Sequence, residues 1–430
     1  MKQRIAVIGG GYAGFAAAVT LAAAGRAVTV FEAARTLGGR ARRVEAYGTT
    51  VDNGAHILLG AYRQTLKLLR TVHGAGAESH LLERRRLALE QPKVFRLRTL
   101  ALPAPWQLVA GLLGMRGVSR GDRLATIALV RHLARSGFQC APEVTVAALL
   151  ADSPPRVTSL LWEPLCLAAL NTPIEAASAQ VFLNVLRMAF ARRARDSDLL
   201  FPRVDLSTLF PDAAAAYVAD HGGEIRAGAT VRRVETDESG VAVTAGYAED
   251  KFSAVVIAVG PHQVKRLLGD AADAATCAAL DALAYEPIVT VYLKYPLALD
   301  LGRPMFKLDG WPGQWVFDRG SLDGPDGLAA VVISTSAPGA RISHDSLARA
   351  IDAQLRRVWP NLPTPEWTQV IAERRATYAC TAGLIRPSPG RIAPGLYLAG
   401  DYTDAELPAT LEAATRSGVA AARALLGRHR

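Results

Sequence analysis

Four residues near the N-terminus have types and spacing suited to holding a pyrophosphate and a ribose. Gly9, Gly11 and Gly14 form a GxGxxG motif directly after the apolar run 5–8, and Glu32 ends a second apolar run. The first glycine of such a motif makes a tight turn, the second lets backbone approach a pyrophosphate, and the third lets helix and strand pack closely. A carboxylate in the position of Glu32 accepts hydrogen bonds from ribose hydroxyls and disfavours a 2′-phosphate, which argues against NADP. The pattern predicts a dinucleotide site.

These residues require a strand, a glycine turn, an Ala-rich helix from about Tyr12 and a second strand, which together form a βαβ unit. The helix would direct its free N–H groups and the positive end of its dipole at a phosphate. Residues 5–25 contain no charged side chain and follow Lys2 and Arg4, a pattern that a signal peptide or a transmembrane helix also shows. Three consecutive glycines and the strand that follows favour the βαβ unit.

Two further stretches are placed to contact a bound cofactor. The segment from Asp52 to His56 (DNGAH) follows a strand predicted over 43–51 and precedes the apolar run 57–60. Near the C-terminus, residues 395–399 predict a strand that ends at Gly400-Asp401, and a helix opens at 408–414. A helix N-terminus stabilises negative charge, such as that of a reduced flavin.

GxGxxG, the acid at Glu32 and Gly38-Gly39-Arg40 together resemble the N-terminus of the FAD-dependent amine oxidase and phytoene desaturase superfamily. The resemblance implies that Arg40 neutralises an FAD phosphate, that 54–56 lies beside the isoalloxazine, that Val231 contacts adenine, and that Asp401 holds ribitol and phosphate. The implied FAD site comprises Gly9, Gly11, Ala13, Gly14, Glu32, Ala33, Gly39, Arg40, Ala41, Gly54, Ala55, His56, Val231, Gly400, Asp401, Thr410, Leu411 and Ala414.

The expected fold class is α/β, with a discontinuous Rossmann-like FAD-binding domain built on a parallel sheet and a second, α+β substrate domain, as in amine oxidases. We expect residues 1–75, 205–265 and 385–430 in the first domain and 76–204 and 266–384 in the second, because 430 residues exceed one ordinary domain. Residues 285–294 predict the central strand of the substrate sheet, with neighbours at 315–318 and 329–335. The helix predicted over 174–192 is either a packing helix or one wall of a long apolar cavity.

The charge and composition of the chain limit the kinds of macromolecule or membrane that it is expected to bind. The net charge of +10 comes mostly from arginine, but no nucleic-acid-binding motif accompanies it, so we expect no nucleic acid partner. Residues 103–135 alternate apolar side chains, including Trp106, with arginines. Such a stretch suits peripheral contact with an anionic membrane, although ordinary core helices show the same pattern. We expect a cytoplasmic protein that contacts the inner membrane peripherally.

Four cysteines, Cys140, Cys166, Cys277 and Cys380, are scattered without CxxC spacing, so we predict neither a metal site nor a disulfide framework. Cys380 is the one candidate for tethering a flavin, and we expect FAD to bind non-covalently. Amine oxidases of the resembled superfamily place aromatic side chains and a lysine near the flavin. Tyr378 and either Lys294 or Lys307 are candidates for these roles, but none lies in a convincing motif.

Four longer segments, DNGAHILLG, LNTPIEAASAQVFLNVL, SDLLFPRVDLSTLFP and RRATYACT, resemble the hydroxysqualene dehydroxylase family of bacterial hopanoid pathways. The resemblance implies that reduced FAD gives hydride to an allylic carbon of hydroxysqualene while the hydroxyl leaves as water and squalene forms. That chemistry needs an apolar cavity, a proton donor and a separate electron donor for the flavin. His56 is the first candidate for the acid, with Asp52 as its orienter; a purely structural histidine in a turn is the alternative.

Three other functions remain open. A carotenoid or phytoene-type desaturase runs hydride in the opposite direction, and the sequence does not fix that direction. A flavin amine oxidase shares the cofactor motifs. A non-enzymatic isoprenoid carrier similar to GDP-dissociation inhibitors shares the fold without needing flavin, and the intact GxGxxG, Glu32 and Gly400-Asp401 argue against it.

Overall fold

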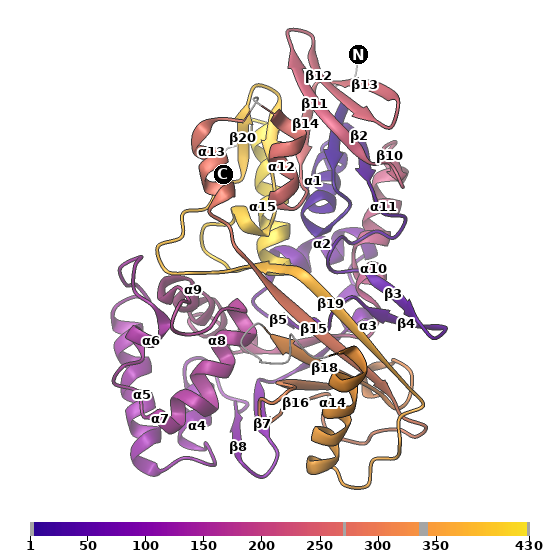
Figure 1. Cartoon of the computed structure of the whole chain (residues 1–430). Coiled ribbons are helices and arrows are strands. Elements are labelled where there is room, and N and C mark those ends of the chain that lie inside the picture. Colours follow the sequence, from indigo (N-terminus) through magenta and orange to yellow (C-terminus); the bar gives the residue numbers. More distant parts are fainter. Residues whose placement is uncertain (1–3, 270–271, 335–342, 428–430) are drawn as a thin grey trace.

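The computed structural model describes residues 4–269, 272–334 and 343–427; the predicted domain ranges and the strand predicted to end at Thr335 also include residues outside these. A six-stranded sheet forms one end of the molecule (Figure 1). Its strands run in the order β10 (Glu224–Ala227), β2 (Ala27–Glu32), β1 (Arg4–Ile8), β14 (Ala254–Ile257), β21 (Leu396–Leu398) and β20 (Gly390–Ala393). All neighbours pair in parallel except β20 with β21, so distant chain segments meet in one sheet.

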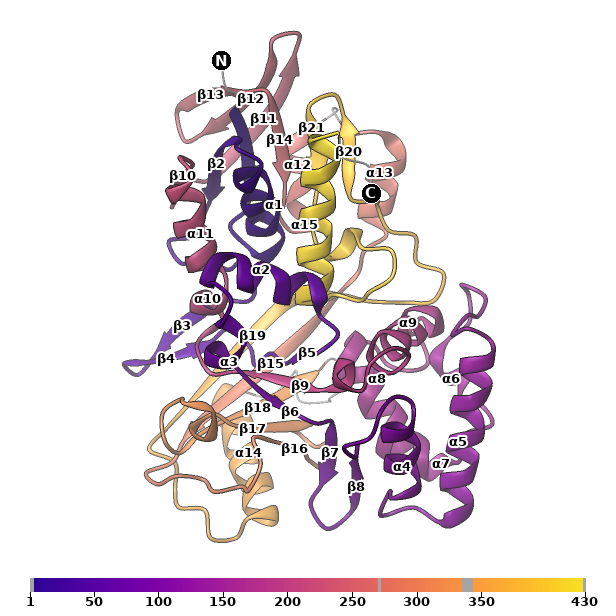
Figure 2. The ribbon, with the colours of Figure 1, turned by 180° about the vertical axis from the view of Figure 1, so that it is seen from behind.

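The inner strands of this sheet are mostly apolar and buried, since other elements cover the sheet. Strand β14 is buried at every position, as parallel strands covered on both faces are. The covering helices include α1 (Tyr12–Ala23), α11 (Pro211–Asp220), α12 (Pro261–Leu268) and α15 (Leu411–Leu425), which Figures 1 and 2 show around the sheet. Helices α1 and α15 approach closely, since a Cβ atom at Gly418 would lie 2.1 Å from the carbonyl oxygen of Ala13.

Smaller elements surround the six-stranded sheet. An antiparallel sheet of β11 (Val231–Asp237), β12 (Gly240–Ala245) and β13 (Ala248–Phe252) packs against one face of its inner strands, and α2 (Arg63–His73), α10 (Leu206–Leu209) and α13 (Ala274–Asp281) complete this part. The strand predicted over 43–51 is a hairpin of β3 (Arg43–Ala46) and β4 (Thr49–Asp52). Tyr47 and Gly48 both have positive φ angles, of 50° and 72°, which reverse the chain between the strands.

The second part of the molecule contains a five-stranded antiparallel sheet. Its order is β16 (Met305–Lys307), β17 (Trp315–Asp318), β18 (Leu328–Ser334), β15 (Tyr285–Lys294) and β19 (Trp367–Tyr378), with α14 (His344–Val358) packed against it. Strand β15 pairs with β18, as predicted, and with β19. The prediction that residues 315–318 also border β15 is wrong, because β17 pairs with β18 instead. Figure 1 shows the long strands β15 and β19 reaching from this sheet toward the six-stranded one.

A group of helices lies beside the five-stranded sheet in both views. It comprises α4 (Trp106–Leu113), α5 (Arg120–Arg135), α6 (Val146–Leu149), α7 (Pro155–Val157), a π-helical turn (Thr158–Trp162), α8 (Glu163–Leu170) and α9 (Ala179–Phe190). Short elements connect it to the rest: β5 (Leu58–Leu59), α3 (Ala77–Leu81), β6 (Leu82–Arg85), β7 (Ala88–Gln91), β8 (Phe95–Arg98), β9 (Leu199–Pro202) and 3₁₀ turns at Ala194–Ser197, Gly320–Leu322 and Asp401–Thr403. In the parts of the chain that the structure describes, no helix has both the length and the apolar character that a bilayer crossing requires.

Candidate functional site

A cavity of about 460 Å³ lies at the carboxyl ends of β1, β2, β14 and β21, which is where open parallel sheets bind ligands. Most of the residues predicted to bind cofactor meet there although they come from five distant segments. Those in its wall are Gly9, Gly11, Ala13, Glu32, Ala33, Gly39, Arg40, Ala41, His56, Val231, Gly400, Asp401, Thr410, Leu411 and Ala414.

Each glycine of the GxGxxG motif has a different reason to be glycine. Gly9 has a φ of 111°, and a Cβ there would lie 2.5 Å from the carbonyl oxygen of Ala258. Gly14 does not line the cavity; a Cβ there would lie 1.8 Å from the Gly9 carbonyl oxygen, so it serves packing of helix on strand. Gly11 lines the cavity, and the nearest protein atom to a Cβ there would be 3.8 Å away. Gly11 therefore leaves space for a ligand.

Glu32 holds the glycine turn against the end of β2. Its Oε2 accepts a hydrogen bond from the Gly10 N–H at 2.6 Å, and its Oε1 accepts one from the Ala34 N–H at 2.8 Å. A carboxylate oxygen can accept more than one hydrogen bond, so these contacts leave capacity for ribose hydroxyls.

Arg40 and Asp401 join the two ends of the sequence. Arg40 Nη2 donates to Asp401 Oδ1 at 2.6 Å, and Nη1 donates to the Ala376 carbonyl oxygen of β19 at 2.7 Å. Asp401 is buried, and Arg40 is partly exposed toward the cavity. The guanidinium thus links the Gly400-Asp401 turn to β19 of the five-stranded sheet beside the cavity wall.

Two helices begin at the cavity. Helix α1 starts after Gly11 without a side-chain cap, so its first N–H groups are available to a ligand. Helix α15 starts after Thr410, whose hydroxyl accepts from the Ala413 N–H at 3.1 Å. Thr410, Leu411 and Ala414 of that start all line the cavity. Both helix dipoles therefore favour negative charge in a bound group.

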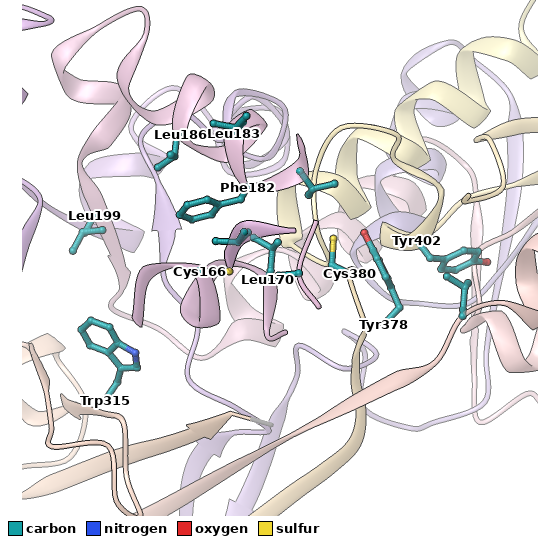
Figure 3. Packing of buried hydrophobic residues seen from close by; sticks show 14 of the residues in the cluster. Cys166, Leu170, Phe182, Leu183, Leu186, Leu199, Trp315, Tyr378, Cys380 and Tyr402 are labelled. Carbon is teal, nitrogen blue, oxygen red and sulfur yellow. The ribbon is translucent and has the colours of Figure 1, made fainter. Parts of the chain in front are cut away.

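A second cavity, of about 320 Å³ and mostly apolar, adjoins the first. Helix α9 contributes five side chains to its wall: Val185, Leu186, Met188, Ala189 and Phe190. Leu199 and Trp315, shown with Leu186 in Figure 3, line it from β9 and β17. Both interpretations of this helix are therefore confirmed, because Phe182 and Leu183 pack in the core while the five α9 side chains form part of the cavity wall. Gly54 and Ala55, predicted to contact cofactor, line this second cavity and not the first.

The two cavities share part of their walls, which we call the junction. Its residues are Arg40, His56, Glu373, Ala376, Ala409, Thr410 and Leu411. A planar group bound in the first cavity can therefore meet an apolar molecule bound in the second at these side chains.

His56 lies at the junction, and the ring is fixed by its own loop. Nδ1 lies 2.8 Å from the Gly54 carbonyl oxygen, which can only accept, so Nδ1 carries hydrogen and Nε2 of the neutral ring is an acceptor. Burial lowers the pKa of His56; the Gly54 carbonyl opposes this shift and the charge of Arg40 adds to it. The neutral form is thus favoured at neutral pH.

Asp52 does not orient His56, contrary to the sequence-based prediction. It lines neither of the two cavities, and its Oδ1 accepts from the Leu206 N–H at 2.8 Å. Its backbone carbonyl accepts from the Tyr292 hydroxyl at 2.8 Å. Burial raises the pKa of Asp52 to about 7. The strand β4 ends before the loop turns toward the junction, and Asp52 instead lines a separate cavity with Tyr292 and Arg319.

The other candidates for the flavin surroundings also lie elsewhere. Lys294 Nζ donates to the Tyr295 carbonyl oxygen and pairs with Glu366, and Lys307 Nζ donates to Gln91. Tyr378 and Cys380 are buried and line neither cavity, and burial raises the pKa of the Cys380 thiol to about 11. Within the described ranges, no cluster of three or more His, Cys, Asp or Glu side chains is placed to hold a metal ion.

Sequence reasoning missed one side of the site. Glu373 and Arg375 of β19, His262 and Arg266 of α12 and Tyr285 of β15 line the first cavity. The Tyr285 hydroxyl accepts from the His262 N–H at 3.1 Å, and Arg375 lies over the Tyr285 ring. Glu373, Arg375 and Tyr285 carry no motif, because they reach the cavity through the pairing of β15 with β19, and His262 and Arg266 reach it because α12 follows β14. The arginine pair at 374–375 was the only available signal.

The family model for flavin containing amine oxidoreductases matches residues 12–426, and the chain therefore belongs to this family. It is a flavin-dependent oxidoreductase with an amine oxidase-like fold. Among curated proteins, it is 29% identical to a hydroxysqualene dehydroxylase of Rhodopseudomonas palustris, with 99% of each chain covered. A hydroxysqualene dehydroxylase of Zymomonas mobilis is 26% identical, with 97% of each covered. Among solved structures, a putrescine oxidase bound to putrescine superposes with a TM-score of 0.74 at 17% identity over 100% of both chains, which shows the shared fold.

Proposed function

We propose that this protein binds FAD non-covalently and uses it to remove the allylic hydroxyl of hydroxysqualene, giving squalene. One observation carries the proposal: a mostly apolar cavity opens onto the dinucleotide-type cavity at His56 and Glu373. The full-length similarity to hydroxysqualene dehydroxylases supports the choice of substrate.

The first cavity fits FAD in its polar groups and in its open backbone. Gly11 leaves room for a pyrophosphate, Glu32 stands at the ribose position, and the uncapped start of α1 provides N–H donors. We propose that residues 1–75, 205–265 and 385–430 form the FAD-binding domain and that 76–204 and 266–384 form the substrate domain. Reduced FAD supplies a hydride, and a separate electron donor must reduce it again.

The chain's own residues bind the apolar substrate, exclude water and position the hydroxyl. Leu186, Leu199 and Trp315 offer apolar contact to an isoprenoid chain. We propose that His56 at the junction binds the hydroxyl, by accepting through Nε2 when neutral and by donating when protonated. Because its pKa is lowered, a role as donor would grow as pH falls.

We also propose peripheral contact with the cytoplasmic face of an anionic membrane. Five exposed apolar side chains belong to α4, α5 and the segment before them: Leu100, Leu102, Trp106, Leu113 and Leu124. Exposed arginines at 116, 120 and 131 accompany them. An interfacial tryptophan beside basic side chains is the composition that such contact uses. A substrate that dissolves in the bilayer gives this contact a purpose.

The test is to reduce the purified flavoprotein without oxygen and to add hydroxysqualene. Reoxidation of the flavin with formation of squalene supports the proposal. If the reduced flavin is not reoxidised by hydroxysqualene while the oxidised protein is bleached by a polyene precursor that still has C–C single bonds to desaturate, the protein is a desaturase, the second candidate. If an amine bleaches it, the protein is an amine oxidase. A colourless protein that cannot be reconstituted with FAD would favour the carrier.

A further inference from the structure

Glu373 is an acidic residue at the junction of the two cavities. Among the described residues that line the apolar cavity, it alone carries a carboxyl group, and it also lines the first cavity. Three of its neighbours along β19 also line the cavities. Arg375 lines the first cavity, Thr377 lines the apolar cavity, and Ala376 lines both. The carboxyl therefore stands where a flavin and an apolar substrate would meet.

The carboxyl is held in place from two sides. Asn53 Nδ2 donates to Glu373 Oε2 at 3.2 Å and to the Arg40 carbonyl oxygen at 3.1 Å. Glu373 Oε1 accepts from the Arg375 N–H at 3.3 Å. Strand pairing sets Glu373 opposite Ile288 of β15, another residue of the apolar wall. These contacts fix the group in the DNGAH loop's vicinity without using all of its oxygen lone pairs.

Four charged or titratable groups face Glu373 from the surrounding elements. Arg40 and His56 come from the N-terminal segment, His262 from α12 and Arg375 from β19 itself. Arg40 and Arg375 place positive charge beside the carboxyl group. In its protonated form the Glu373 carboxyl group can donate a proton to a group bound at the junction.

We propose that Glu373 protonates the departing hydroxyl of the substrate, an assignment that rests on the proposed function. The carbon–oxygen bond breaks as the Glu373 proton passes to the oxygen, so that water leaves. The hydride of reduced FAD forms the new carbon–hydrogen bond; the flavin loses two electrons and the allylic carbon gains them. The Glu373 carboxylate then recovers a proton from solvent. His56 is the positioning residue, whose Nε2 accepts the hydroxyl hydrogen and holds the oxygen near the carboxyl.

The test compares two leaving groups in the flavin-loaded protein. The Glu373→Gln variant should reoxidise with hydroxysqualene about 10²- to 10⁴-fold more slowly than the unaltered protein, the usual range for a lost general acid. With the allylic chloride of the same skeleton, which needs no proton to leave, its rate should stay within about threefold. The rate with the alcohol should also lose its fall toward high pH. Glu366→Gln, which alters a carboxylate that pairs with Lys294 and lines neither cavity, is the control.

Binding is measured separately from turnover. Squalene should change tryptophan fluorescence equally in Glu373→Gln and in the unaltered protein, because Trp315 lines the cavity in both. Equal turnover of the alcohol by the variant, or an equal loss with alcohol and chloride, overturns the assignment and leaves the proposed function intact. If the unaltered protein turns over neither compound, the proposed function itself is wrong. If Glu373→Gln fails to retain flavin, Glu373→Asp decides, since it must keep the fall in rate toward high pH.

Discussion

Glu32 offers the sharpest test of the cofactor site, because one carboxylate has two separable duties. Its oxygens accept from the Gly10 and Ala34 N–H groups at 2.6 and 2.8 Å, and its predicted ligands are ribose hydroxyls. Glu32→Gln keeps one carbonyl oxygen but turns an amide NH₂ toward a backbone donor. One hydrogen bond to a charged group is lost and one N–H loses its partner, at about 1–3 kcal/mol each when buried. Because the Ala34 contact is exposed, we expect about 1–2 kcal/mol of lost stability in the flavin-free protein.

The same substitution should weaken FAD binding further. Losing the hydrogen bonds between the ribose hydroxyls and the Glu32 carboxylate should cost about 2 kcal/mol of binding free energy. This corresponds to about a 30-fold rise in the Kd for FAD. Urea unfolding of the flavin-free protein measures the first effect, and quenching of flavin fluorescence measures the second. Glu45→Gln, on the exposed hairpin where Glu45 accepts from Thr50, is the matched control. An unchanged Kd for FAD in Glu32→Gln would refute the ribose assignment, even if stability fell.

Three other perturbations follow from the geometry. Ala189→Phe, which places a ring in the wall of the apolar cavity, should raise KM for hydroxysqualene at least tenfold while FAD affinity stays constant; an unchanged KM would mean that the substrate binds elsewhere. The pKa of Asp52 is raised from 3.8 to about 7, so the folded state binds more protons between these values and stability falls as pH rises. Asp52→Asn should therefore be more stable than the unaltered protein at pH 8 by about 4 kcal/mol and equal to it near pH 3, as urea unfolding would show; a constant difference across pH would contradict this. Trp106→Ala should reduce binding to anionic vesicles by about tenfold in sedimentation assays, whereas Tyr247→Ala, fully exposed on the β12–β13 hairpin, should not; equal losses would exclude α4 as the contact.

The sequence was sufficient to predict the nucleotide-binding half of the fold, because its signals are local. GxGxxG needs a turn, a close backbone approach and a tight helix, and the structure has each at Gly9, Gly11 and Gly14. Gly400 and Asp401 likewise follow the end of β21, as the sequence predicts.

What could not be predicted depends on pairing between distant strands. Glu373 lies at the junction because β19 pairs with β15 in a register that sets Glu373 opposite Ile288. This register cannot be predicted from the residues of either strand alone. Asp52 was misplaced for a related reason. Its neighbours in sequence suggested a contact with His56, but the partner that it reaches, Leu206, lies 154 residues away.

The central claim is tested most directly by a single turnover in D₂O. The protein would be reduced anaerobically and mixed with one equivalent of hydroxysqualene. Flavin absorbance would report reoxidation, and mass spectrometry would measure the mass of the product. The account predicts one squalene for each flavin reoxidised, with one deuterium at the carbon that carried the hydroxyl, because the flavin hydride exchanges with solvent before transfer. Flavin that stays reduced, or squalene that forms without flavin oxidation, would contradict it.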